Sequence, residues 1–221
     1  MSSIQSKHTY DVAERPVCGH EMLSGQVFGF TAAPLEDGPD VSWLPKCRVW
    51  DDQTQYGACV IFAFASWCEI MYGVSISDGD CVTVYLQALK DNGLEFNSGL
   101  TYEMGLAAVV KAGWLPATTK LHAEPNLSAI TGQPLLAAYA VTPAWDKPNS
   151  AGCLDHNAGG KVRGYHAVVI AAKGVLSSVN GWPYVWIENS WGEWGWKGIG
   201  MMSDTLHLSM IQEVYSLQGA A

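Results

Sequence analysis

The feature that most constrains this chain is a long apolar segment with a cysteine at its start. Residues Ala58–Tyr72 are apolar at nearly every position and lack the polar stripe of a surface helix. A helix that is apolar all round is buried on most sides, so this segment predicts the central helix of a globular core. The uninterrupted apolar run stops at Glu69 and is too short to span a bilayer.

Cys59 stands at the predicted start of this helix, six residues after Gln53. Unpaired backbone N–H groups and the positive end of the helix dipole favour thiolate over thiol at such a position, which makes a cysteine nucleophilic. The Gln53 side-chain amide and the Cys59 backbone N–H could together stabilise an oxyanion beside the sulfur. A lone cysteine before an apolar helix is more often a core residue, so this interpretation requires further groups.

A thiolate nucleophile needs a base and a residue that orients the base, and the second half of the chain offers both. His166 opens a strand-like run rich in β-branched residues, and Asn189 ends the next such run, just before Trp191. Taken singly, the histidine could be a surface group and the asparagine part of a plain turn. Together with Gln53 and Cys59, they occur in the order that this chemistry requires.

These motifs resemble the papain family of cysteine peptidases, in particular its bacterial and viral branches. The resemblance covers about residues 38–217. It implies that Cys59 is the nucleophile, His166 the base, Asn189 the residue that holds the imidazole, and Gln53 the oxyanion donor. It also implies that Trp191 shields the bond between histidine and asparagine from water.

The resemblance extends to the expected walls of a substrate cleft. The segment Asp40–Trp43 resembles the start of a mature papain-type domain, and Asn97–Leu100 resembles the glycine-rich wall. Two pairs of residues are therefore expected to bind an extended peptide, through backbone hydrogen bonds or by lining a side-chain pocket. They are Ser98 with Gly99, and Gly164 with Tyr165. Two positions depart from the family: Val60 stands where many members have tryptophan, and Tyr56 where many have a disulfide cysteine.

The pattern along the chain predicts an α+β protein, with helices first and strands later. The resemblance implies a papain-like fold of two lobes with the active site in the cleft between them. A helical lobe would span about residues 50–125 around the central buried helix, and an antiparallel, β-barrel-like lobe about residues 126–217. The individual elements expected are helices at Val82–Leu89 and Tyr102–Ala112, and strands at Leu135–Val141, His166–Ala171 and Tyr184–Glu188.

Residues 1–37 are expected to form a separate leader, ahead of a peptidase domain at 38–221. The apolar patch of this leader, Val27–Ala33, could lie extended in the cleft as a short, tethered pro-segment. It could equally pack across the back of the two lobes as a clasp.

The composition of the chain limits which binding partners are expected. The net charge is −9 with only 12 Lys and Arg residues, which disfavours nucleic acid because phosphate binding needs a basic face. The first residues have no apolar core of a secretory signal, so the expectation is a cytoplasmic monomer of bacterial or viral origin with no membrane association, or a protein packaged in a virion.

The remaining cysteines are expected to be thiols. Cys68 lies in the apolar helix and is interpreted as a small buried hydrophobe. Four others, Cys18, Cys47, Cys81 and Cys153, allow three disulfide pairings, but free thiols fit a reducing compartment better. A zinc site built from Cys18 with His20 and Cys153 with His156 lacks the spacing of a closed tetrahedral site. No metal and no organic cofactor is expected.

The sequence therefore predicts a cysteine endopeptidase that acts on peptide or protein substrates. Two alternatives stay open: an amidase or acyltransferase with the same Cys–His chemistry, and a non-catalytic binding or virion protein on the same fold.

Overall fold

The computed structural model describes residues 40–48, 51–146, 148–149, 152–155, 160–176 and 182–220. The leader at 1–37 and its apolar patch lie outside these residues, as do Cys18, His20 and His156 of the alternative zinc site.

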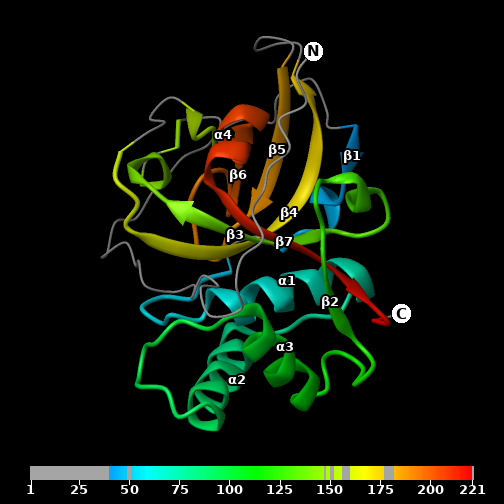
Figure 1. Cartoon of the computed structure of the whole chain (residues 1–221), viewed down its shortest axis with the longest axis vertical. Helices are drawn as coiled ribbons and strands as arrows, with labels where there is room; N and C mark the ends of the chain where they lie inside the picture. The colour runs from blue at the N-terminus through cyan, green and yellow to red at the C-terminus, as the bar shows by residue number, and fades with distance from the viewer. Residues whose placement is uncertain are drawn as a thin grey trace.

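The central helix predicted from the apolar segment is present. Helix α1 spans Cys59–Tyr72, and every residue from Cys59 through Ile70 is buried. It ends at Gly73, whose φ of 67° is left-handed and therefore suits glycine. Figure 1 shows α1 lying between the sheet on one side and helices α2 and α3 on the other.

The two helices that cover α1 have strong local start signals. Helix α2 spans Asp78–Asp91 and begins with a capping box in which Ser77 and Asp80 exchange hydrogen bonds. It is longer at both ends than the predicted helix. Helix α3 spans Tyr102–Lys111, as predicted to within one residue, and the Thr101 side chain caps it.

The strands form one antiparallel sheet, and a short helix, α4 (Asp204–Met210), lies beside it. The strand order is β2-β7-β3-β4-β5-β6, and β1 also pairs with β4. The strands are β1 (Val41–Ser42), β2 (Lys120–Ala123), β3 (Leu135–Val141), β4 (Gly164–Leu176), β5 (Trp182–Glu188), β6 (Ile199–Ser203) and β7 (Ile211–Gln218). The three predicted strands correspond to β3, β4 and β5.

The α+β class is confirmed, but the expectation of a barrel-like lobe needs correction. The sheet is open: β2 and β6 are its two edges, and no pairing between them closes it within the described part of the chain. A closed barrel requires the first and last strands to pair, and among the described strands β2 pairs only with β7 and β6 only with β5.

Strand β3 explains how the sheet separates two cores. Every residue of β3 is buried, and side chains alternate between the two faces. Leu136 and Ala138 pack with α1, whereas Leu135, Ala137 and Tyr139 pack into a second core with Trp residues and α4. The sheet is therefore the wall against which α1 places its N-terminal cysteine.

Two findings bear on expectations from the sequence. The five cysteines among the described residues, Cys47, Cys59, Cys68, Cys81 and Cys153, form no disulfide with one another. None of the helices in the described part of the chain is long and apolar enough to cross a membrane.

Candidate active site

Cys59 is the first residue of α1, and the structure places its sulfur against strand β4. No side-chain hydrogen bond caps this helix at Ala58. The Ala167 backbone N–H donates to Cys59 Sγ at 3.5 Å, and Cys59 is fully buried. Because Ala167 directly follows His166, this contact brings the predicted nucleophile beside the predicted base.

His166 is held by Asn189 across neighbouring strands. His166 Nε2 and Asn189 Oδ1 are 2.6 Å apart, and both side chains are buried. Asn189 directly follows β5, which pairs with β4 along most of its length. With Nε2 bonded to the asparagine, Nδ1 is the ring nitrogen left for exchanging a proton with another group.

Aromatic rings enclose the imidazole. The Trp191 ring lies 4.4 Å from the His166 ring at an interplanar angle of 31°. Trp145 contacts the same imidazole edge-on at 5.9 Å and stacks on Trp194 at 5.7 Å. Trp191 was predicted from the sequence, whereas Trp145 was missed as a neighbour of the site. It ends a short 3-10 turn between β3 and β4, and no local motif connects it to the histidine.

Gln53 is held in one orientation by two hydrogen bonds. The Ser190 hydroxyl donates to Gln53 Oε1 at 2.7 Å, and Gln53 Nε2 donates to the Tyr56 carbonyl at 2.8 Å. An amide nitrogen carries two N–H groups, so one remains for a further acceptor. Ser190 was not predicted as a site residue. The consecutive residues Asn189 and Ser190 thus hold the predicted base and the predicted oxyanion donor respectively.

The backbone carrying Gln53 is also tied to the sheet. Gln53 N–H donates to the Ser190 carbonyl at 2.9 Å, and Gly192 N–H donates to the Asp51 carbonyl at 2.9 Å. Asp52 and Trp191 form the antiparallel bridge between these two bonds. This short ladder fixes the loop before α1 against the segment after β5.

The expected substrate-binding residues lie on two different elements. Ser98 and Gly99 belong to the loop between α2 and α3, where the Tyr85 hydroxyl donates to the Ser98 carbonyl at 2.7 Å. Gly164 and Tyr165 open β4 and pair with β3, and the half-buried Tyr165 side chain packs against the core that contains α1. One pair is therefore fixed to the helices and the other to the sheet.

A cluster of buried acids lies behind the site. Arg48 Nε is 3.1 Å from Asp51 Oδ1, and its guanidinium also contacts Glu69 at 3.3 Å. Burial raises the pKa of Asp51 to about 7 despite the nearby guanidinium, and burial raises the pKa of Glu188 to about 8. Asp51 lies two residues before Gln53, and Glu188 directly precedes Asn189. No pattern in the sequence predicted this cluster.

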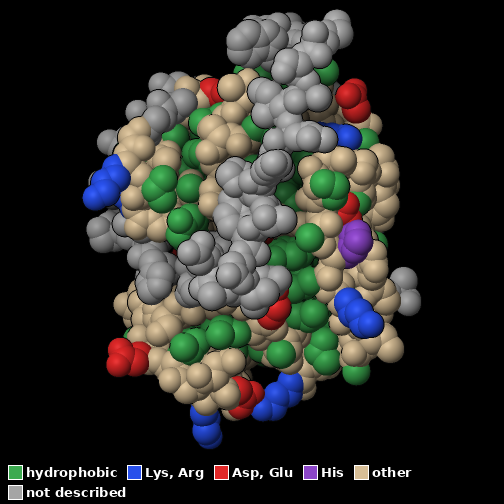
Figure 2. All heavy atoms as spheres, in the orientation of Figure 1, with side chains coloured by type: hydrophobic (Ala, Val, Ile, Leu, Met, Phe, Trp, Pro, Cys, Tyr) green, Lys and Arg blue, Asp and Glu red, His purple; other side chains and the backbone are tan. Residues whose placement is uncertain are grey.

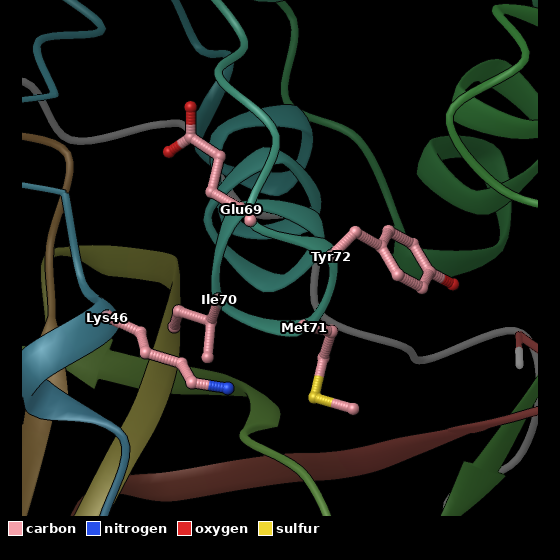
Figure 3. A pocket seen from close by; sticks show the side chains of 6 residues that line it. Lys46, Glu69, Ile70, Met71 and Tyr72 are labelled. Atoms are coloured by element: carbon pink, nitrogen blue, oxygen red, sulfur yellow. The ribbon is translucent and has the colours of Figure 1, made fainter.

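A separate pocket lies at the far end of α1, away from Cys59. Its lining includes Lys46, Glu69 and the last turn of α1. Figure 3 shows the Glu69 carboxylate and the Lys46 amine pointing in different directions, so they do not converge on one point. Within the described residues no group of three or more His, Cys, Asp or Glu side chains is placed to hold a metal ion.

Comparison with known proteins identifies the fold. No protein-family profile matches the chain, and no curated protein matches its sequence. Xylellain, a cysteine protease from Xylella fastidiosa, matches with a TM-score of 0.62 and 15% identity over 95% of this chain and 99% of that chain. Digestive procathepsin L 3 from Tenebrio molitor matches with a TM-score of 0.57 and 13% identity over 91% of this chain and 75% of that one. Procathepsin B S9 from Trypanosoma congolense gives a TM-score of 0.57 and 15% identity over 92% and 86% of the two chains.

The chain therefore has the papain-like fold of these cysteine proteases. At such low identity the likeness defines the fold, and the reaction must be argued from the site itself.

Proposed function

We propose that this protein is a cysteine endopeptidase in which Cys59 is the nucleophile, His166 the general base and acid, Asn189 the residue that orients the imidazole, and Gln53 an oxyanion donor. The observation that carries the proposal is the pair of contacts on either side of His166. Its Nε2 is bonded to Asn189 at 2.6 Å, and the next residue donates to the Cys59 sulfur at 3.5 Å. Cys59, His166 and Asn189 thus adjoin one another and are buried, as this mechanism requires.

The reaction proceeds in two halves. The Cys59 thiolate attacks the scissile carbonyl, whose oxygen becomes negative and accepts hydrogen bonds from the free Gln53 amide N–H and the Cys59 backbone N–H. The protonated His166 gives its proton to the leaving amine, and a thioester forms. Water, deprotonated by His166, then attacks the thioester and releases the acid.

The surroundings of the site favour this chemistry. Trp191 and Trp145 exclude water from the histidine, which strengthens its bond to Asn189 in a low-dielectric setting. Ser98 with Gly99 and Gly164 with Tyr165 would hold an extended peptide on either side. Among the described residues on the face shown in Figure 2, lysine and arginine side chains are scattered and form no basic patch, which fits a peptide better than a nucleic acid as substrate.

The test combines thiol labelling with a peptide library. An epoxide that traps thiolates should label Cys59 in the wild-type protein and nothing in Cys59→Ala, which should also cleave no peptide. The matched control is Cys68→Ala, which should still be labelled at Cys59. Cys68 lies in the same helix, and burial raises the pKa of its thiol to about 12, so the Cys68 thiol itself should not react with the epoxide.

Two results would overturn the proposal. Labelling of Cys59 without cleavage of any library peptide, but with transfer or hydrolysis of small amides, would identify an amidase or acyltransferase. Absence of labelling in a folded protein would identify a non-catalytic member of the fold.

A further inference from the structure

Tyr85 connects the two loops on the helical side of the proposed cleft. It lies on α2, is fully buried, and was not singled out by its sequence context. Its hydroxyl donates to the Ser98 carbonyl at 2.7 Å, and its ring packs edge-on against Tyr56, with centroids 6.3 Å apart. Tyr56 in turn accepts the Gln53 amide N–H at 2.8 Å through its carbonyl. One side chain therefore touches both the wall loop and the loop that carries the oxyanion donor.

The hydrogen bond to Ser98 has a consequence for Gly99. A trans peptide group is planar, so its carbonyl and the N–H of the next residue point in opposite directions. The described residues contain no cis peptide bond. With the Ser98 carbonyl directed at Tyr85, the Gly99 N–H is directed away from α2. Tyr85 thereby sets the direction of the backbone group that is expected to pair with an extended substrate.

Further contacts hold the same two loops together around Tyr85. Asn97 has a left-handed φ of 65°, and its Oδ1 accepts the Gly57 backbone N–H at 2.6 Å. Phe96 packs edge-on against Tyr56 at 6.0 Å. Burial raises the pKa of Tyr85 to about 12, so its hydroxyl stays a donor at any pH at which the protein would work. The loop of Phe96–Ser98 and the loop of Gln53–Gly57 are therefore held together, and Tyr85 contacts both.

We propose that Tyr85 is a positioning residue, which fixes the Gly99 N–H for substrate binding and couples this wall to the loop of Gln53. The inference rests on the proposed function and deepens it. Without the hydroxyl, the Ser98–Gly99 peptide group loses the bond that fixes its plane. Substrates long enough to reach Gly99 should then bind less well, whereas the chemistry at Cys59 should continue.

The experiment compares Tyr85→Phe with Tyr102→Phe, because the chain offers a close match. Tyr102 is also buried, lies on α3, and donates its hydroxyl to the Ala137 carbonyl at 2.8 Å, away from the wall loop. Both variants keep the ring and lose the hydroxyl group that donates to a backbone carbonyl. Melting temperatures establish that both variants are folded. The melting temperature should fall by a similar amount in each variant.

Activity is measured on two substrates, an extended peptide amide and a single acylated amino-acid ester too short to reach Gly99. Tyr85→Phe should raise KM for the peptide about fivefold, the usual effect of one neutral hydrogen bond, and change the ester by less than about twofold. Tyr102→Phe should change neither by more than about twofold.

Equal losses on peptide and ester, or equal losses in the two variants, would overturn the role of Tyr85 while leaving the proposed peptidase intact. No turnover of either substrate by the wild-type protein would instead remove the proposed function, and this role with it.

Discussion

Glu188 allows a prediction of how stability depends on pH. It is the last residue of β5 and is 4% exposed. Burial, followed by the nearby carboxylate of Asp51, raises its pKa from the ordinary 4.5 to about 8. A charged carboxylate at this position would be desolvated beside another acid, so the folded protein holds Glu188 protonated at neutral pH.

The direction and size of the change in stability with pH follow from the linkage between proton binding and folding. The unfolded chain loses this proton near pH 4.5 and the folded protein near pH 8, so the folded state binds more protons between these values. Stability therefore falls as pH rises through that window and is fully present below it. At about 1.4 kcal/mol per pH unit, Glu188 alone contributes a loss of at most about 5 kcal/mol. Asp51, with its pKa raised from 3.8 to about 7, acts in the same direction.

The perturbation is Glu188→Gln, a neutral substitution of nearly the same shape. The free energy of unfolding, measured with urea, should fall less between pH 5 and pH 9 in the variant than in the wild type. The variant should therefore be the more stable protein at pH 9. Glu193→Gln, at an exposed position, is the control and should follow the wild type at both pH values. Parallel stability profiles of the wild type and Glu188→Gln would refute the reasoning, because they would mean that Glu188 ionises alike in the folded and unfolded states.

Three further predictions concern the site and the thiols. Gln53→Ala should keep epoxide labelling of Cys59 but lower peptide turnover about 100-fold, as expected for one oxyanion donor, and a parallel fall in labelling would mean a structural role. Asn189→Ala should lower kcat less than His166→Ala, since Asn189 orients the base and transfers no proton; equal losses with unchanged melting temperatures would contradict that role. Titration of thiols in denaturant without reductant should give a count near the six cysteines of the sequence, and a count near two would indicate disulfides.

Local pattern was sufficient for several parts of the fold. The apolar segment at Ala58–Tyr72 predicts α1, and the β-branched runs predict β3, β4 and β5, because periodicity and composition depend on neighbours in the chain. Strand β6 was missed: its residues 199–203 include glycine and two methionines, so it lacks the composition typical of strands. The open edge of the sheet was also missed, because strand order depends on pairings that no local pattern records.

The site divides in the same way. Gln53, Cys59, His166 and Asn189 could be proposed as site residues from the sequence because their order along the chain resembles that of the papain family. The groups that hold them could not. Ser190 bonds Gln53 across 137 positions of the chain, Trp145 reaches His166 only when β3 and β4 pair, and Tyr85 reaches Ser98 only when α2 packs beneath the wall. The identity and order of the chemical groups can be read from the chain alone. Their distances and partners depend on the folded structure, because packing brings together residues whose separation along the chain carries no local signal.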